Sequence, residues 1–250
     1  MLVTRPATEA ARWVSDFRAH GVDAIALPLI AIEPVEDEAL LAAARAAVSG
    51  YSALMFVSAA AVSHFFGGAE VVQSGPRFWA TGPGTTRALE QAGVPLSSID
   101  SPPSDAGGFD SEALWMRVAS QVRTGTRVLI VRGGEAAGRP AGRDWLAREI
   151  IAAGGLCDAV VAYRRLPPVF GDAQRRIASD AATGAAIWLF SSSEAIANLC
   201  RAMPGTDWRC ACAIATHARI GEAARSAGFG RVRVSAPTMA ALVASIESSE

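Results

Sequence analysis

Small and hydroxyl-bearing residues recur where predicted strands end and predicted helices begin. A helix N-terminus offers unpaired N–H groups and a partial positive charge, so several such ends around one cleft would bind a polyanion. Arginines at two of these points would add forked hydrogen bonds to carboxylates. Helix capping is the commoner role of any single serine or threonine. The evidence for an anion-binding site is that such residues recur at matching strand ends in both parts of the chain. The candidate substrate-binding residues are Arg5, Ser58, Ala59, Gly82, Thr85, Arg132, Gly133, Ser191, Ser192, Thr216 and His217.

Tyr163 is the candidate catalytic residue. It is one of two tyrosines in the chain, and it precedes Arg164 and Arg165 in an extended run that we interpret as a crossing between domains. A phenol facing a cleft could donate a hydrogen bond or a proton to a leaving group, helped by nearby positive charge. The alternative role is an aromatic side chain that only packs within the linker.

Several classes of chemistry are excluded by what the sequence lacks. All 23 basic residues are arginine, so a Walker A loop and a Schiff base, which both need lysine, are ruled out. The stretches TGPGTT and RGGEAAG lack the G-x-G-x-x-G spacing, which argues against a nicotinamide cofactor. No G-x-S-x-G nucleophile motif occurs. A net charge of −1 gives no field that favours nucleic acid.

The four cysteines show no C-x-x-C spacing. Cys210 and Cys212 could join His217 as metal ligands. A full ligand set is missing, so we favour reduced cysteines in a cytosolic protein and expect no metal site.

One pattern is written twice, about 134 residues apart. FVSAAAV at 56–62 returns as FSSSEAI at 190–196, and WATGPGTTRALEQAG at 79–93 returns within 213–229. Each copy reads as strand, helix, strand, helix and a glycine stop. A repeat of this length is a whole domain. In the second copy, the Ser191 to Glu194 spacing predicts a capping box at the start of a helix.

Strands that alternate with helices predict parallel sheets covered on both faces. Two long extended runs, 28–35 and 161–168, do not fit the alternation of strands and helices. We interpret them as paired linker strands between domains. The fold is then two similar doubly wound α/β domains of the flavodoxin or Rossmann kind, joined by a two-stranded linker. The first domain is discontinuous, with residues 1–30 plus 167–250, and the second is residues 37–160. We expect a small ligand in the cleft between them.

No apolar run approaches the roughly 20 residues that span a bilayer, and the N-terminus MLVTRP does not resemble a secretory signal. We therefore expect a cytoplasmic protein without a membrane partner. The sequence shows no strong dimer surface, so we expect a monomer.

A set of ordered motifs resembles the uroporphyrinogen-III synthase family over essentially the whole chain. The motifs are VTRP, the S-x-x-x-V after the strand at 54–57, TGPGTTRALEQAG, FDSEAL, VRG followed by GRDWLA, AYRR and FSSSEAI. The resemblance implies two α/β domains joined by a two-stranded linker, with the first domain discontinuous.

The resemblance implies a lyase of tetrapyrrole biosynthesis that needs no metal or cofactor. Its substrate is hydroxymethylbilane, a linear tetrapyrrole with eight carboxylates, and the bilane-producing enzyme is a partner for transient hand-off. The enzyme removes water, inverts the last pyrrole ring and closes uroporphyrinogen III. Because the bilane also closes spontaneously without inversion, catalysis implies holding one conformation.

Within the resemblance, Thr85 matches the threonine of a glycine-threonine motif, and Tyr163 matches a linker tyrosine proposed to assist loss of hydroxide. Ser58 and Ser192 match the serines after the paired strands. Ala60 stands where the family usually has asparagine. His217 and Ile220 replace the second glycine-threonine motif, so we do not expect the two copies to bind substrate alike.

Two other functions are compatible with the same residues. One is a non-catalytic two-domain sensor of an acidic metabolite, and the other is a two-domain enzyme acting on phosphorylated sugars. Both would use helix N-termini to bind an anion.

Overall fold

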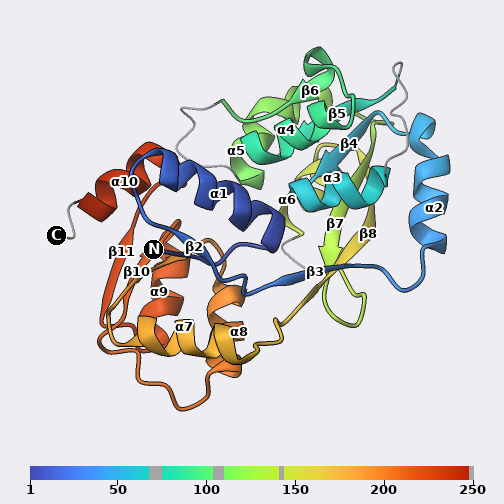
Figure 1. The fold of residues 1–250 in the computed structure, drawn as a ribbon. Helices are drawn as coiled ribbons and strands as arrows, with labels where there is room; N and C mark the ends of the chain where they lie inside the picture. Colours follow the sequence, from blue (N-terminus) through green and yellow to red (C-terminus); the bar gives the residue numbers. More distant parts are fainter. Residues whose placement is uncertain (68–74, 104–109, 141–143, 248–250) are drawn as a thin grey trace. The chain divides into compact units, whose positions relative to one another are not determined.

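The structure is a computed structural model that describes residues 1–67, 75–103, 110–140 and 144–247. The chain divides into two compact units: Met1–Ala31 with Leu166–Glu250, and Ile32–Arg165 (Figure 1). Each unit contains a sheet with parallel strand pairs and helices, so the predicted α/β fold class is confirmed. Phe109 of FDSEAL and residues 142–143 of GRDWLA lie outside the described residues.

The first unit has a sheet with the strand order β11-β10-β9-β1-β2, in which every neighbouring pair is parallel. Its elements are β1 (Leu2–Val3), α1 (Ala7–Ala19), β2 (Ile25–Ala26), α7 (Asp172–Ala182), β9 (Ile187–Phe190), α8 (Ser193–Ala202), β10 (Cys212–Ala215), α9 (Ala218–Ser226), β11 (Arg231–Val234) and α10 (Met239–Glu247).

The second unit has a sheet with the strand order β3-β8-β7-β4-β5-β6. Its helices and strands are β3 (Ala31–Pro34), α2 (Ala39–Ala46), β4 (Ala53–Phe56), α3 (Ala59–Phe66), β5 (Arg77–Ala80), α4 (Pro83–Gln91), β6 (Ile99–Asp100), α5 (Ser111–Val118), β7 (Arg127–Gly134), α6 (Trp145–Ala152) and β8 (Leu156–Leu166). Short 3-10 helices occur at Val48–Gly50, Leu96–Ser98 and Ala119–Gln121.

The two sheets share one topology. The order β11-β10-β9-β1-β2 in the first corresponds to β6-β5-β4-β7-β8 in the second. The repeated segments at 56–62 and 190–196 therefore follow equivalent strands, β4 and β9. Strands β1 and β7, which come from distant parts of the chain, also occupy equivalent positions. The repeat seen in the sequence is thus a repeat of three-dimensional topology.

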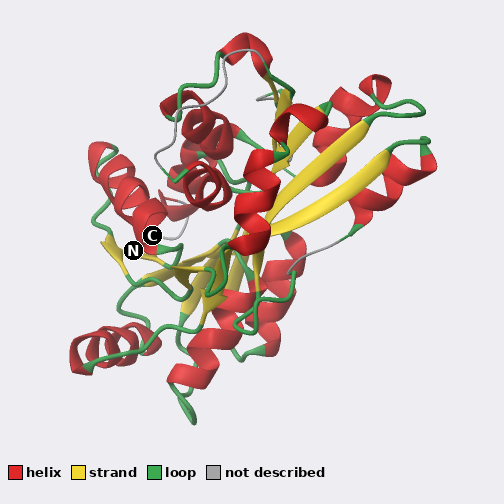
Figure 2. Cartoon of the chain, turned by 90° about the vertical axis from the view of Figure 1, so that its right-hand side faces the viewer, coloured by secondary structure: helices red, strands yellow, loops and turns green. Residues whose placement is uncertain are grey.

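Strand β4 shows why the central strands read as continuous apolar runs, since all four of its residues are buried. Leu54 and Phe56 pack in a cluster with α3 and α4, whereas Ala53 and Met55 pack with residues of α5 and α6. Successive side chains of a strand point to opposite faces, and helices flank the strands (Figure 2). A strand with helices on both faces has no polar side to show.

The extended runs predicted to link the domains contain β3 and the C-terminal part of β8. These two strands are neighbours in the sheet of the second unit. Strand β8 extends from Leu156 to Leu166, and its first half pairs with β7, so that half also belongs to the sheet. The predicted domain and linker boundaries stay predictions.

The capping box predicted from Ser191 to Glu194 is wrong. Helix α8 begins one residue later, with Ser192 as N-cap, and the Ser192 side chain makes no capping hydrogen bond. Glu194 is then the second helical residue rather than the third, the position from which a side chain reaches back to the cap. None of the helices formed by the described residues is long and apolar enough to span a bilayer.

Candidate functional site

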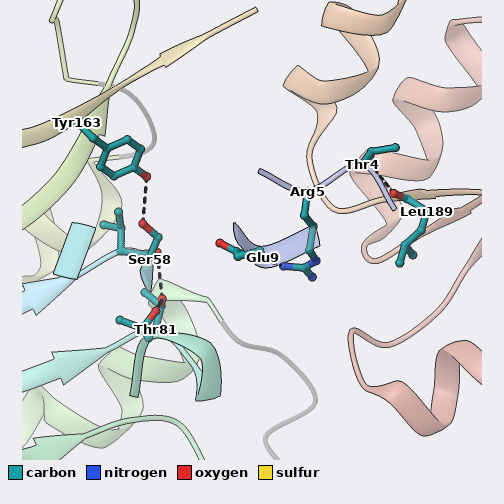
Figure 3. Close-up of polar contacts among 9 residues, drawn as sticks. Thr4, Arg5, Glu9, Ser58, Thr81, Tyr163 and Leu189 are labelled. Carbon is teal, nitrogen blue, oxygen red and sulfur yellow. Dashed lines mark hydrogen bonds and ion pairs between the residues drawn. The ribbon is translucent and has the colours of Figure 1, made fainter. Parts of the chain in front are cut away.

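The centre of the candidate site is a contact between Ser58 and Tyr163. Ser58 follows β4 as the N-cap of α3, and its Oγ accepts a hydrogen bond from the N–H of Ala61 at 3.1 Å. The same Oγ lies 3.0 Å from the phenol oxygen of Tyr163 (Figure 3). Tyr163 belongs to β8 and is only 3% exposed. The structure therefore joins the two candidates from different strands in one hydrogen-bonded pair.

His64 packs on the ring of Tyr163, and the sequence argument did not select it. The two ring centroids are 5.7 Å apart with an interplanar angle of 34°. Burial lowers the pKa of His64, and Glu38 opposes this only in part. The imidazole thus presents a neutral aromatic face to Tyr163 near neutral pH. Its place in the sequence gave no signal, because residues six apart along a helix lie on different faces.

Arg164 and Arg165 were expected to supply positive charge near Tyr163, but the guanidinium of Arg164 is bound to other groups. Arg164 donates hydrogen bonds to the Glu36 carboxylate and, at 3.1 Å, to the carbonyl of Pro34. Its guanidinium also lies 3.6 Å from Glu33. Consequently Arg164 holds the segment that contains β3 and is paired with acidic groups there.

The second candidate cluster follows β5. Gly82 is the N-cap of α4 and has extended backbone, and its carbonyl accepts hydrogen bonds from the N–H groups of Thr85 and Thr86. Thr81 donates to the carbonyl of Val57 at 3.2 Å, which connects the ends of β4 and β5 (Figure 3). The hydroxyl of Thr85 is 3.5 Å from that of Thr81. Thr85 is buried, and its role in binding substrate stays a prediction.

Arg132 and Gly133 lie near the end of β7, and both are covered by other side chains. The side chain of Arg132 is 7% exposed, and its Nη1 is 2.7 Å from the carboxylate of Asp144, the N-cap of α6. Hydrogen bonding and charge from Arg132 lower the pKa of Asp144. A Cβ added at Gly133 would lie 2.7 Å from two carbons of the Tyr163 ring. The predicted carboxylate receptor thus already holds a carboxylate, a partner that the sequence did not reveal.

In the first unit, Arg5 follows β1, and its side chain packs against the first turns of α1. Its guanidinium pairs with Glu9 at 3.0 Å (Figure 3). The guanidinium also stands 4.5 Å over the ring of Trp13. Burial lowers the pKa of Arg5, and the charge of Glu9 opposes this. The neighbouring Thr4 donates to the carbonyl of Leu189 at 2.6 Å, which fastens the end of β1 to β9.

The other candidates of the first unit lie where β9 and β10 end. Ser191 and Ser192 precede α8 and are half-buried. The N–H of Thr216 donates to the carbonyl of Phe190, so the two strand ends are adjacent. His217 is the N-cap of α9, and its Nδ1 accepts a hydrogen bond from the N–H of Arg219 at 3.1 Å. A cap role accounts for the imidazole at the position where the first copy has Gly82, the N-cap of α4.

The cysteines are free thiols. All four are unpaired with one another, and burial raises the pKa of Cys157 to about 11. Within residues 1–67, 75–103, 110–140 and 144–247, no group of three or more His, Cys, Asp or Glu side chains could hold a metal ion.

Comparison with known proteins gives a consistent family match. The family model described as uroporphyrinogen-III synthase HemD matches residues 11–244. A protein of Chlorobaculum parvum named uroporphyrinogen-III synthase is 29% identical over an alignment of 185 residues, and the match covers 70% of this chain and 67% of that protein.

Two crystal structures share the fold. A mutant uroporphyrinogen III synthase of Thermus thermophilus has a TM-score of 0.57 and 13% identity, covering 99% of this chain and 97% of that one. The uroporphyrinogen-III synthetase of Helicobacter pylori has a TM-score of 0.57 and 13% identity, covering 90% and 92% of the two chains. At this identity the likeness concerns the fold alone.

Proposed function

The chain belongs to the uroporphyrinogen-III synthase family, and we propose on that basis that it converts hydroxymethylbilane to uroporphyrinogen III. The reaction removes one water, inverts the last pyrrole ring and closes the macrocycle, which makes the enzyme a lyase. The contact between Ser58 and Tyr163 is the observation that carries the proposal, because it places a phenol in a defined position beside a helix N-terminus.

Tyr163 is the proposed catalytic residue. As the bond between the bilane's terminal carbon and its hydroxyl breaks, the phenol donates a hydrogen bond or its proton to the departing oxygen. The hydroxyl leaves as water. The ring that closes releases one proton, which restores the phenol and balances the reaction.

Ser58 is proposed to orient that phenol. Its oxygen already accepts the N–H of Ala61, so its own hydrogen is available for the phenol oxygen of Tyr163. With the phenol oxygen accepting from Ser58, the phenol hydrogen is free to point at the leaving group. Oriented hydrogen bonds of this kind cost no reorganisation at the moment of reaction.

The N-termini of α3 and α4 are the proposed receptors for substrate carboxylates in the second unit. Ser58 with Ala59 and Gly82 lie at these helix starts. A helix N-terminus attracts an anion through its N–H groups and dipole. In the first unit, Arg5, Ser191, Ser192, Thr216 and His217 remain predicted binding positions.

The test is the identity of the product. Freshly made hydroxymethylbilane is supplied to the purified protein, and the uroporphyrinogen isomers are separated after oxidation. We expect the type III isomer in excess over the type I isomer formed spontaneously. Formation of type I isomer alone would contradict the proposal. If the bilane nevertheless binds, that result would favour a sensor of acidic metabolites.

A further inference from the structure

Gly133 lies beneath the ring of Tyr163. Strand β7 separates β8 from β4 in the sheet, so the Tyr163 side chain must pass over β7 to reach Ser58 at the end of β4. Neighbouring strands are about 4.8 Å apart, and two such spacings separate β8 from β4. The residue of β7 paired with Tyr163 is Gly133.

A side chain at Gly133 would occupy the space that the ring now fills. A Cβ there would lie 2.7 Å from both Cε2 and Cζ of Tyr163 and 2.9 Å from its phenol oxygen. These atoms form the hydroxyl end of the ring. Gly133 is absent from the glycines with positive φ among the described residues, so the requirement is for space rather than for a special backbone conformation.

A one-residue irregularity in β8 turns the ring toward Gly133. The register pairs Arg132 with Val161 but Gly133 with Tyr163, which leaves Ala162 as the extra residue. Consecutive side chains of a regular strand point to opposite faces, yet Ala162 and Tyr163 pack in the same core cluster. The extra residue thus brings Tyr163 to the face where α3 and Ser58 lie, as bulges do when they re-aim a side chain.

We propose that Gly133 is a positioning residue whose missing side chain fixes the phenol oxygen of Tyr163 beside Ser58. Its role in catalysis rests on the function proposed above, whereas its role in seating the ring does not. The sequence-based expectation was instead that Gly133 binds substrate.

The position of the Tyr163 ring over Gly133 can be tested without any assay of activity. Tyrosine labelled with carbon-13 at Cζ gives two resonances, because the chain has only Tyr51 and Tyr163, and Tyr51→Phe assigns them. We expect Gly133→Ala to shift the Tyr163 resonance and leave that of Tyr51 in place. The control is Gly134→Ala, whose Cβ would meet Val161 at 2.7 Å rather than the tyrosine. An unchanged Tyr163 resonance in Gly133→Ala overturns the proposal.

A double-mutant cycle covers the case in which Gly133→Ala is unstable. Overpacking should lower its folding equilibrium constant at least about tenfold, but less than about threefold in a Tyr163→Ala background, where the ring is gone. Equal losses in both backgrounds, including failure of both proteins to fold, overturn the proposal.

The catalytic part is tested by turnover. We expect Gly133→Ala to lower kcat at least about tenfold in the parent but less than about threefold in Tyr163→Phe, which lacks the hydroxyl being positioned. A similar kcat loss in both backgrounds would mean that Gly133 acts on substrate directly. If the parent forms no type III isomer, the proposed function fails, while the resonance and folding experiments still decide whether Gly133 seats the ring.

Discussion

The phenol oxygen of Tyr163 lies 3.0 Å from the hydroxyl oxygen of Ser58, although 105 positions separate the two residues in sequence. The contact couples the start of α3 to the strand that ends the second unit. It depends on the order β8-β7-β4 and on a β7 residue without a side chain between the partners. The fold thus brings two residues that are distant in the sequence into one hydrogen-bonded pair.

Replacement of Ser58 should affect both stability and turnover. Ser58→Ala removes the cap of α3 and should lower the free energy of unfolding by about 1 kcal/mol. Ser192→Ala is the matched control, because Ser192 occupies the equivalent N-cap without a side-chain capping bond; its loss should stay under about 0.5 kcal/mol. Urea denaturation measures both. Equal losses would show that the Ser58 cap contributes nothing.

The same substitution tests the orientation of the phenol. Ser58→Ala should lower kcat in the parent protein and have little further effect in Tyr163→Phe, since the two residues act through one hydrogen bond. Steady-state rates of the four proteins measure this. Independent, multiplicative effects would separate Ser58 from Tyr163.

Arg132 and Asp144 should shift substrate affinity in opposite directions. Arg132→Ala is expected to raise KM more than it lowers kcat, because a carboxylate-binding guanidinium is lost. Asp144→Asn removes the negative charge that pairs with Arg132 and would compete with a substrate carboxylate, so we expect KM to fall. An unchanged KM in both variants would assign the pair to structure alone.

Asp100 makes stability depend on pH. Burial disfavours its charge, but hydrogen bonds from Arg77 and Gln121, together with the charges of Arg77 and Arg117, lower the pKa of Asp100 below its ordinary value of 3.8. Because the folded-state pKa is below the unfolded-state pKa, the stabilisation is present above 3.8 and is lost as the pH falls through the folded-state value. Asp100→Asn should therefore destabilise the protein at neutral pH by about 2 kcal/mol.

The control for Asp100 is Asp207→Asn. Asp207 also has a lowered pKa, about 2, through hydrogen bonds from Arg209, but this pair is exposed on the surface. We expect its replacement to leave the denaturation midpoint nearly unchanged. The difference in the free energy of unfolding between the parent and Asp100→Asn should become smaller as the pH is lowered from roughly 5 toward 2. A constant difference would contradict the assignment.

The sequence was sufficient for the elements and their repeated order, because apolar periodicity and glycine stops are local signals. Strand β4 and helix α4 appear where the pattern predicts them. The start of α8 was misplaced by one residue, since a run of three serines offers several caps and the pattern does not choose among them.

The site was only partly predictable. Tyr163 and Ser58 were selected separately, but their contact depends on the extra residue Ala162, and regular alternation would have put Tyr163 on the other face. Asp144 was not anticipated as the partner of Arg132, because residues 12 apart meet only through the fold. Gly133 was selected as a substrate-binding residue, whereas the distances from an added Cβ to Tyr163 show a requirement for space.

The role of Tyr163 as proton donor is tested most directly by the rate at which Tyr163→Phe forms the type III isomer. Tyr51→Phe is the matched control, because it removes the only other phenol, which bonds Asp158 at 3.0 Å on the surface. We expect Tyr163→Phe to lower kcat at least about tenfold, as loss of a positioned proton donor does, while Tyr51→Phe retains the parent rate. Full turnover by Tyr163→Phe would contradict the role assigned to Tyr163.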